Sequence, residues 1–85
     1  MINFKNKSVV ITGGTKGIGA EISKTFLRHD AKVFILARQK PKRAIQAKGN
    51  KAIFIECDIK NLESLDGAIS IIKSKYKSIK YYIDK

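Results

Sequence analysis

The 85-residue sequence predicts an α/β fold, in which a parallel sheet of about four strands forms one domain over residues 1–85. Short apolar runs alternate with segments of helical spacing in the order β-α-β-α-β-α-β. The apolar runs lack polar alternation, which is typical of parallel strands covered on both faces. With right-handed crossovers, this alternation gives a parallel sheet.

The first strand is predicted over Ser8 to Thr12, after a polar lead-in. The first helix should run from about Lys16 to His29, where we expect the lone histidine to be exposed. Asp30 can close the helix because Asp tolerates left-handed geometry. The apolar residues of the helix recur at three- and four-residue intervals, which puts them on one face against the sheet. They are Ile18, Ile22, Phe26 and Leu27.

The second strand is predicted over Ala31 to Ala37. Pro41 fits the first turn of a short second helix through about Lys48, and Gly49-Asn50 should end that helix. The third strand is predicted over Ala52 to Cys57.

A third helix is predicted from Asn61, which has the chemistry of an N-cap, to about Lys77. A weaker fourth strand follows over Lys80 to Asp84. The apolar spacing of the helix marks its buried face. That face comprises Leu62, Leu65, Ala68, Ile69, Ile72 and Tyr76.

The composition indicates a packed, basic protein. A hydrophobic content of 44% argues against disorder, and the net charge of +11 attracts anions, whether dinucleotide phosphates, nucleic acid or a membrane surface. The basic residues concentrated in 38–51 and 73–85 are interpreted as solvated helix faces. The single Cys57 cannot form an intramolecular disulfide, and no apolar run is long enough to cross a membrane. We therefore expect a cytoplasmic protein without a membrane contact.

A glycine-rich turn, Thr-Gly-Gly-Thr-Lys-Gly-Ile-Gly over residues 12–19, joins the first strand to the first helix. Such a turn suits a phosphate, because the unpaired amides and the dipole at a helix start favour an anion. Gly13 would make the turn, Gly17 would admit a pyrophosphate, and Gly19 would pack the helix on the sheet. Ala20 excludes a nucleotide-triphosphatase loop, which needs Lys there. A glycine turn without a ligand is the alternative.

The spacing Thr-Gly-x-x-x-Gly-x-Gly resembles the signature of the short-chain dehydrogenases and reductases, over nearly the whole chain. This resemblance implies a partial Rossmann fold, with strand order 3-2-1-4, and an oxidoreductase that binds a nicotinamide dinucleotide. A flavodoxin-like order is the alternative. The cofactor-binding residues that we predict from the glycine turn and the resemblance are Gly13, Thr15, Lys16, Gly17, Ile18, Gly19, Arg38, Asp58 and Ile59.

The residues after the second strand favour NADP over NAD. Ala37 stands where an acidic residue would bind the ribose 2′-hydroxyl of NAD. Arg38 and Lys16 suit the 2′-phosphate of NADP, and the resemblance points the same way. By resemblance, Asp58 and the backbone of Ile59 contact the adenine ring. The alternative interpretations are that Arg38 and Lys16 are ordinary surface charges and that Asp58 only forms a turn.

The resembling family supplies an Asn-Asn-Ala-Gly segment, a catalytic Ser and a Tyr-x-x-x-Lys pair from later elements. We therefore expect a truncated dinucleotide-binding part that is inactive alone, and we predict no catalytic residue and no metal site within it. Two Tyr-x-x-x-Lys matches, from Tyr76 to Lys80 and from Tyr81 to Lys85, are interpreted as coincidental in a Lys- and Tyr-rich segment.

The predicted sheet would leave Val9 and Ile11 partly uncovered and the fourth strand with an unpaired edge. We therefore expect a homo-oligomer or a missing partner fragment, which a stable monomer in light scattering would contradict. Two other functions remain open: a basic module that binds nucleic acid, and a structural subunit that pairs through the sheet edge. Titration with NADP, NAD and a DNA duplex separates these functions.

Overall fold

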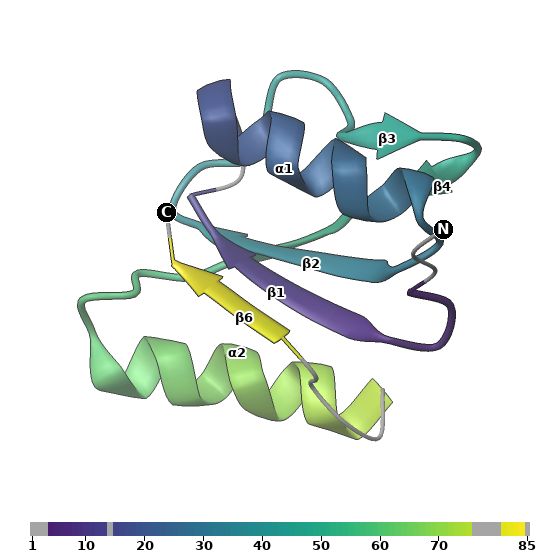
Figure 1. The fold of residues 1–85 in the computed structure, drawn as a ribbon. Coiled ribbons are helices and arrows are strands. Elements are labelled where there is room, and N and C mark those ends of the chain that lie inside the picture. The colour runs from purple at the N-terminus through teal and green to yellow at the C-terminus, as the bar shows by residue number, and fades with distance from the viewer. Residues whose placement is uncertain (1–3, 14, 76–80, 85) are drawn as a thin grey trace.

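The computed structural model describes residues 4–13 and 15–75, and the backbone of residues 81–84. Its main sheet has four parallel strands in the order β5-β2-β1-β6 (Figure 1). This result confirms the α/β class and the predicted order 3-2-1-4. The strands are β1 (Ser8–Thr12), β2 (Lys32–Ala37), β5 (Ile53–Glu56) and β6 (Tyr81–Asp84).

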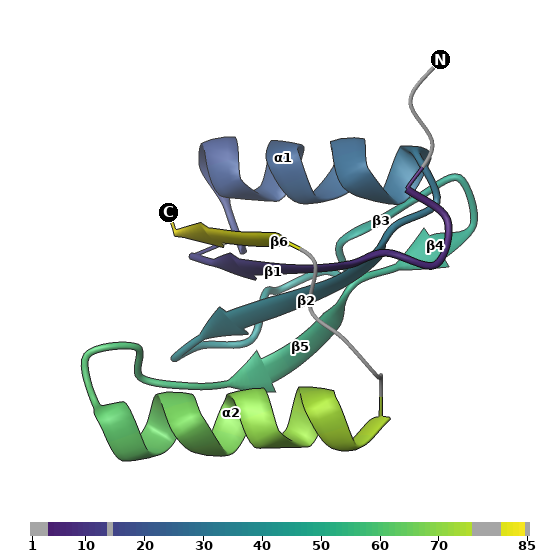
Figure 2. The ribbon, with the colours of Figure 1, turned by 60° about the horizontal axis from the view of Figure 1, so that its bottom comes forward.

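One helix covers each face of the sheet. Helix α1 (Gly17–Arg28) lies on one face and α2 (Leu62–Lys75) on the other, as both ribbon views show (Figures 1 and 2). A small antiparallel hairpin, β3 (Gln46–Ala47) and β4 (Asn50–Lys51), lies on the α1 side. The carboxyl ends of the strands and the amino ends of both helices lie at one end of the molecule, the left in Figure 1. Parallel α/β proteins bind ligands at this end.

Strand β1 is buried on both faces, which explains the apolar run at its centre. Val9 and Ile11 contribute to the core beneath α1, whereas Val10 contributes to the core beneath α2. The expectation that Val9 and Ile11 would be partly uncovered is wrong, since both are 0% exposed. Phe4 and Ile45 complete the cover on that face, because both loop residues pack against the same cluster as α1.

The second helix, predicted from Pro41 to Lys48, does not form. The chain there instead leads into the β3–β4 hairpin, whose turn holds Lys48 and Gly49 at positive φ, 53° and 77°. A helix of about two turns is marginal without strong packing. This segment buries one main anchor, Ile45, whose carbonyl accepts the Ala52 amide at 2.9 Å.

The helix ends agree with the sequence. Lys16 and His29 flank α1 as its caps, and Asp30 has the expected left-handed backbone, with φ 68°. His29, however, is half-buried rather than exposed, because the ring of Phe4 lies edge-on to it with centroids 6.5 Å apart.

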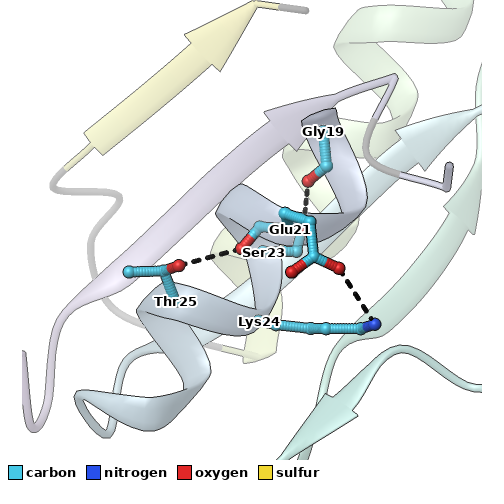
Figure 3. Close-up of polar contacts among 5 residues, drawn as sticks. All are labelled: Gly19, Glu21, Ser23, Lys24 and Thr25. Atoms are coloured by element: carbon cyan, nitrogen blue, oxygen red, sulfur yellow. Dashed lines mark hydrogen bonds and ion pairs between the residues drawn. The ribbon is translucent and has the colours of Figure 1, made fainter. Parts of the chain in front are cut away.

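Two helix positions predicted to face the sheet are exposed: Ile18 at 72% and Leu62 at 76%. Both lie in the first turn of their helices, near the end of the sheet where the strands finish. Small residues take the place of Ile18 in the interface of α1 with the sheet. The buried Ser23 donates its hydroxyl to the Gly19 carbonyl at 2.9 Å, within the helix (Figure 3). The remaining predicted residues of α1 and α2 are at least half-buried, except Tyr76, which lies outside the described residues.

The start of α2 provides a stability prediction. The Asn61 side-chain Oδ1 accepts the Ser64 amide at 3.0 Å, which is an N-cap hydrogen bond. Asn61→Ala should lower the free energy of unfolding by about 1 kcal/mol, because it orphans that amide. Urea denaturation followed by circular dichroism measures the loss, and Asn61→Asp, which keeps an acceptor, should retain the wild-type value. An unchanged midpoint for Asn61→Ala would show that the cap contributes nothing.

Candidate functional site

The glycine turn after β1 needs glycine at two positions. Gly13 and Gly17 have φ of 67° and 60°, a region that side chains with a Cβ rarely adopt. The Gly13 amide donates to the Leu36 carbonyl at 3.1 Å, which ties the turn to β2. A Cβ built on Gly17 would meet no described atom within 4 Å. The turn is therefore open to a ligand at Gly17, where a pyrophosphate was expected.

The start of α1 has its backbone donors available. Lys16 is the N-cap in an extended conformation, φ −155°, and its side chain makes no capping hydrogen bond. Ala20 is the first residue whose amide bonds back into the helix, to the Lys16 carbonyl at 3.4 Å. The first turn contains no acidic residue. The amides of Gly17, Ile18 and Gly19 thus lie at a positive helix end without a described side-chain acceptor.

The ends of β2 and β5 enclose a hollow with a volume of about 260 Å³. It brings together four of the residues singled out in the sequence: Gly13, Arg38, Asp58 and Ile59. Its other lining residues are Ala37 and Cys57, which flank the predicted positions in the sequence, and Leu36 and Lys60, which sequence reasoning missed. Only the position of these residues in the chain could have identified them, because residues that follow adjacent parallel strands meet at the same sheet edge.

Asp58 is held in a defined turn. Its Oδ1 accepts the Lys60 amide at 3.0 Å, and its own amide donates to the Ser64 hydroxyl at 3.0 Å. The turn-forming role therefore applies to the Oδ1 atom of Asp58. Among the described residues, the second carboxylate oxygen has no hydrogen-bond donor, so it can accept one from a ligand. Cys57 before it is 2% exposed, and its amide bonds to the Ala37 carbonyl at 2.9 Å.

Arg38 and Lys16 are both exposed, and neither takes part in the ion pairs of the described residues, Lys24–Glu21 and Lys48–Asp30. Arg38 also lines a small hollow with Glu56, a carboxylate that sequence reasoning did not consider.

The remaining predicted residues lie around a second, larger cleft or beneath it. Thr15, Lys16, Gly17 and Ile18 line the cleft, which runs between α1 and segment 39–45. Gly19 is buried where α1 meets the sheet. The predicted residues are thus divided between this cleft and the hollow at β2 and β5.

Two other features are absent from the described part of the chain. In it, no three His, Cys, Asp or Glu side chains are grouped so that they could hold a metal ion. Neither of its helices combines the length and the apolar character that crossing a membrane requires.

A protein-family model described as short chain dehydrogenase matches residues 7–84. Short-chain dehydrogenase reductase 3a of Arabidopsis thaliana is 35% identical over 78 residues, covering 88% of this chain and 30% of the relative. A short-chain dehydrogenase/reductase of Armillaria gallica is 38% identical over 83 residues, covering 91% of this chain and 27% of the relative. The chain thus spans less than a third of the length of these curated relatives.

Solved structures agree with the sequence matches. Ligand-free aldohexose dehydrogenase of Thermoplasma acidophilum superposes with a TM-score of 0.85 at 29% identity, covering 96% of this chain and 30% of that one. A short chain dehydrogenase of Leptospira borgpetersenii with bound NAD⁺ gives a TM-score of 0.82 at 28% identity, covering 96% and 32%. The matched model, the fold and the glycine turn all agree: the chain belongs to the short chain dehydrogenase family, whose members bind NAD or NADP.

Proposed function

We propose that these residues form the NADP(H)-binding part of a short-chain dehydrogenase/reductase oxidoreductase. The observation that carries the proposal is the start of α1, where the Gly17, Ile18 and Gly19 amides lack side-chain acceptors and Gly17 leaves room for a close approach. A diphosphate bound there would accept hydrogen bonds from these amides and interact favourably with the positive end of the helix.

NADP rather than NAD is favoured by the charges around the end of β2. Ala37 offers no carboxylate to a ribose 2′-hydroxyl, whereas Arg38 is exposed with its guanidinium free of ion pairs among the described residues. A guanidinium can bind a phosphate through two parallel hydrogen bonds, and the Lys16 ammonium adds a point charge. Glu56 and Asp58 line a small hollow with Arg38, and their negative charges reduce this preference.

The hollow between the ends of β2 and β5 supports a place for the adenine ring. Ile59 supplies apolar surface, and it is 38% exposed, so a ring can contact it. The second oxygen of Asp58 can accept a hydrogen bond from the exocyclic amino group of adenine. The nearby Arg38 would then face the 2′-phosphate of the same adenosine.

The nicotinamide carries the hydride, and its transfer to or from a carbonyl also needs an acid/base group beside it. The described residues around the glycine turn and the β2–β5 hollow are assigned to the diphosphate and the adenosine rather than to the nicotinamide. We therefore place the acid/base group outside these residues. The 85-residue chain alone should bind the cofactor without interconverting a carbonyl and an alcohol.

Calorimetric titration of the chain with NADP, NAD and a DNA duplex at about 0.15 M salt tests the proposal. NADP should bind at least about tenfold more tightly than NAD, which corresponds to about 1.4 kcal/mol of selective interaction with the 2′-phosphate. Equal affinity for the two dinucleotides would contradict the NADP assignment. Binding of the duplex alone would contradict the whole proposal in favour of a basic nucleic-acid module.

A further inference from the structure

A cleft with a volume of about 1190 Å³ lies between α1 and segment 39–45. It exists because the helix predicted over residues 41–48 is replaced by an extended loop and a hairpin. Apolar side chains from both walls line it. They are Ile18, Ile22 and Phe26 from α1, and Pro41 and Ile45 from the opposite loop.

The charges around this apolar lining are almost all positive. Five cations line the cleft: Lys16, Lys24, Lys40, Lys42 and Arg43. The lining contains one carboxylate, Glu21, whose Oε2 is paired with the Lys24 ammonium at 3.2 Å (Figure 3). Five cations less one carboxylate leave a net of four positive charges around one cleft. A cleft lined by an excess of one sign of charge attracts ions of the opposite sign.

We propose that this cleft binds an amphipathic anion, which is a small molecule with an aliphatic body and a carboxylate or phosphate head. Ile45 is 8% exposed and Ile18 is 72% exposed among the lining residues, so the apolar lining includes both buried and accessible surface that an aliphatic chain can contact. The cations would hold the anionic head at the rim. Ligand clefts typically have volumes of about 300–1,000 Å³, so a medium-length chain and its head fit within this one.

Other occupants fit the cleft less well. A nucleic-acid strand needs aromatic surfaces on which its bases can stack, and the lining contains only Phe26, half-buried. A second copy of this chain would bring a further +11 charge against a positive surface, which opposes docking. Charge complementarity therefore selects an anion, and the aliphatic lining selects an anion with an apolar body.

The cleft also shares Lys16 and Gly17 with the proposed cofactor site. An anion bound at this end should compete with the phosphates of NADP. The competition rests on the proposed function, whereas the binding of the amphipathic anion does not.

Titration of the chain with decanoate and with decyl phosphate, both below their micelle concentrations, tests the proposal; the two compounds distinguish a carboxylate head from a phosphate head. At least one should bind to saturation as a single molecule per chain. The uncharged analogue 1-decanol should bind at least about tenfold more weakly, since it lacks the charge. Acetate and inorganic phosphate should also bind at least about tenfold more weakly, because they lack the chain.

Two variants and one control locate the site. The double variant Lys42→Glu/Arg43→Glu should weaken decanoate binding at least about tenfold, since it reverses two charges on the rim. Lys73→Glu/Lys75→Glu makes the same change in net charge on α2, outside the cleft, and should leave decanoate binding unchanged. Ile18→Ser should weaken decanoate binding several-fold without changing the thermal unfolding midpoint, because Ile18 is already exposed.

Three results would overturn the proposal: equal affinity for decanol and the anions, equal loss in the two double variants, or binding only above the micelle concentration. Light scattering that showed a dimer released by Lys42→Glu/Arg43→Glu would assign the cleft to a second copy instead. If NADP does not bind but decanoate does, the proposed function fails and this proposal stands. If both bind, NADP should raise the apparent Kd of decanoate.

Discussion

Arg38→Asp should weaken NADP binding by about 100-fold while changing NAD affinity by less than about threefold. The substitution removes a charge-assisted hydrogen bond to the 2′-phosphate, worth about 1.5–3 kcal/mol, and replaces it with a repelling carboxylate. Each 1.4 kcal/mol corresponds to a factor of about ten in Kd. The new carboxylate can accept a hydrogen bond from the 2′-hydroxyl of NAD, which offsets its repulsion of the diphosphate. Calorimetric titration of the variant with both dinucleotides measures the change.

Arg28→Asp is the matched control for this experiment. It changes the net charge by the same amount, but Arg28 is an exposed residue in the last turn of α1, at the opposite end of the helix from the glycine turn. Its NADP affinity should stay close to that of the wild type. A similar loss in both variants would mean that the general positive field, and not Arg38, selects NADP.

Gly17→Asn should abolish measurable binding of both NADP and NAD. Asn tolerates positive φ better than other residues with a side chain, so the turn should persist at the φ of 60°. The new side chain would project into the open space through which the diphosphate approaches, where nothing described lies within 4 Å. We expect a loss of at least about 100-fold in affinity for either dinucleotide, since the diphosphate is common to both.

Gly49→Asn separates this effect from backbone strain. Gly49 also has positive φ, 77°, and open space around its Cβ position, but it lies in the β3–β4 turn away from the predicted site. Both variants should lose a similar, small amount of unfolding free energy in urea. Only Gly17→Asn should lose the dinucleotides. Retained binding in Gly17→Asn would contradict the placement of the diphosphate at this turn.

The parts of the fold that were predictable depend on local signals. The position of β1 follows from its apolar run Val9-Val10-Ile11, because a strand with a helix on each face has no exposed side. The start of α2 follows from Asn61, whose side chain caps the helix. The glycine turn was predictable as well, since positive φ at Gly13 and Gly17 restricts those positions to very few residue types.

The errors arise where tertiary packing decides. Residues 41–48 have helix-forming composition, but Ile45 alone anchors them, and the hairpin turn at Gly49 determines the path of the chain. Helical periodicity assigned Ile18 and Leu62 to the buried faces, but it does not reveal how far the sheet extends under each helix. Val9 and Ile11 were expected on the face that only the Asn61–Lys77 helix covers, but they lie beneath α1, and the strand sequence alone does not reveal which face each helix covers.

The candidate site was predicted only in part for the same reason. The motif residues could be identified directly. Lys60 and Glu56 belong to the site only because β2 and β5 end side by side, which the motif does not indicate. The basic residues of segment 39–45 were interpreted as a solvated helix face. They instead line a cleft, since the helix to which they were assigned does not form.

Amide resonances recorded by NMR during titration with NADP test the central claim, which is that the start of α1 holds the diphosphate. The account predicts that the largest shifts occur at the amides of Gly17, Ile18 and Gly19, and that replacing NADP with NAD removes mainly the shifts at Lys16 and Arg38. Saturable binding of NADP that leaves the Gly17, Ile18 and Gly19 amides unchanged would contradict it.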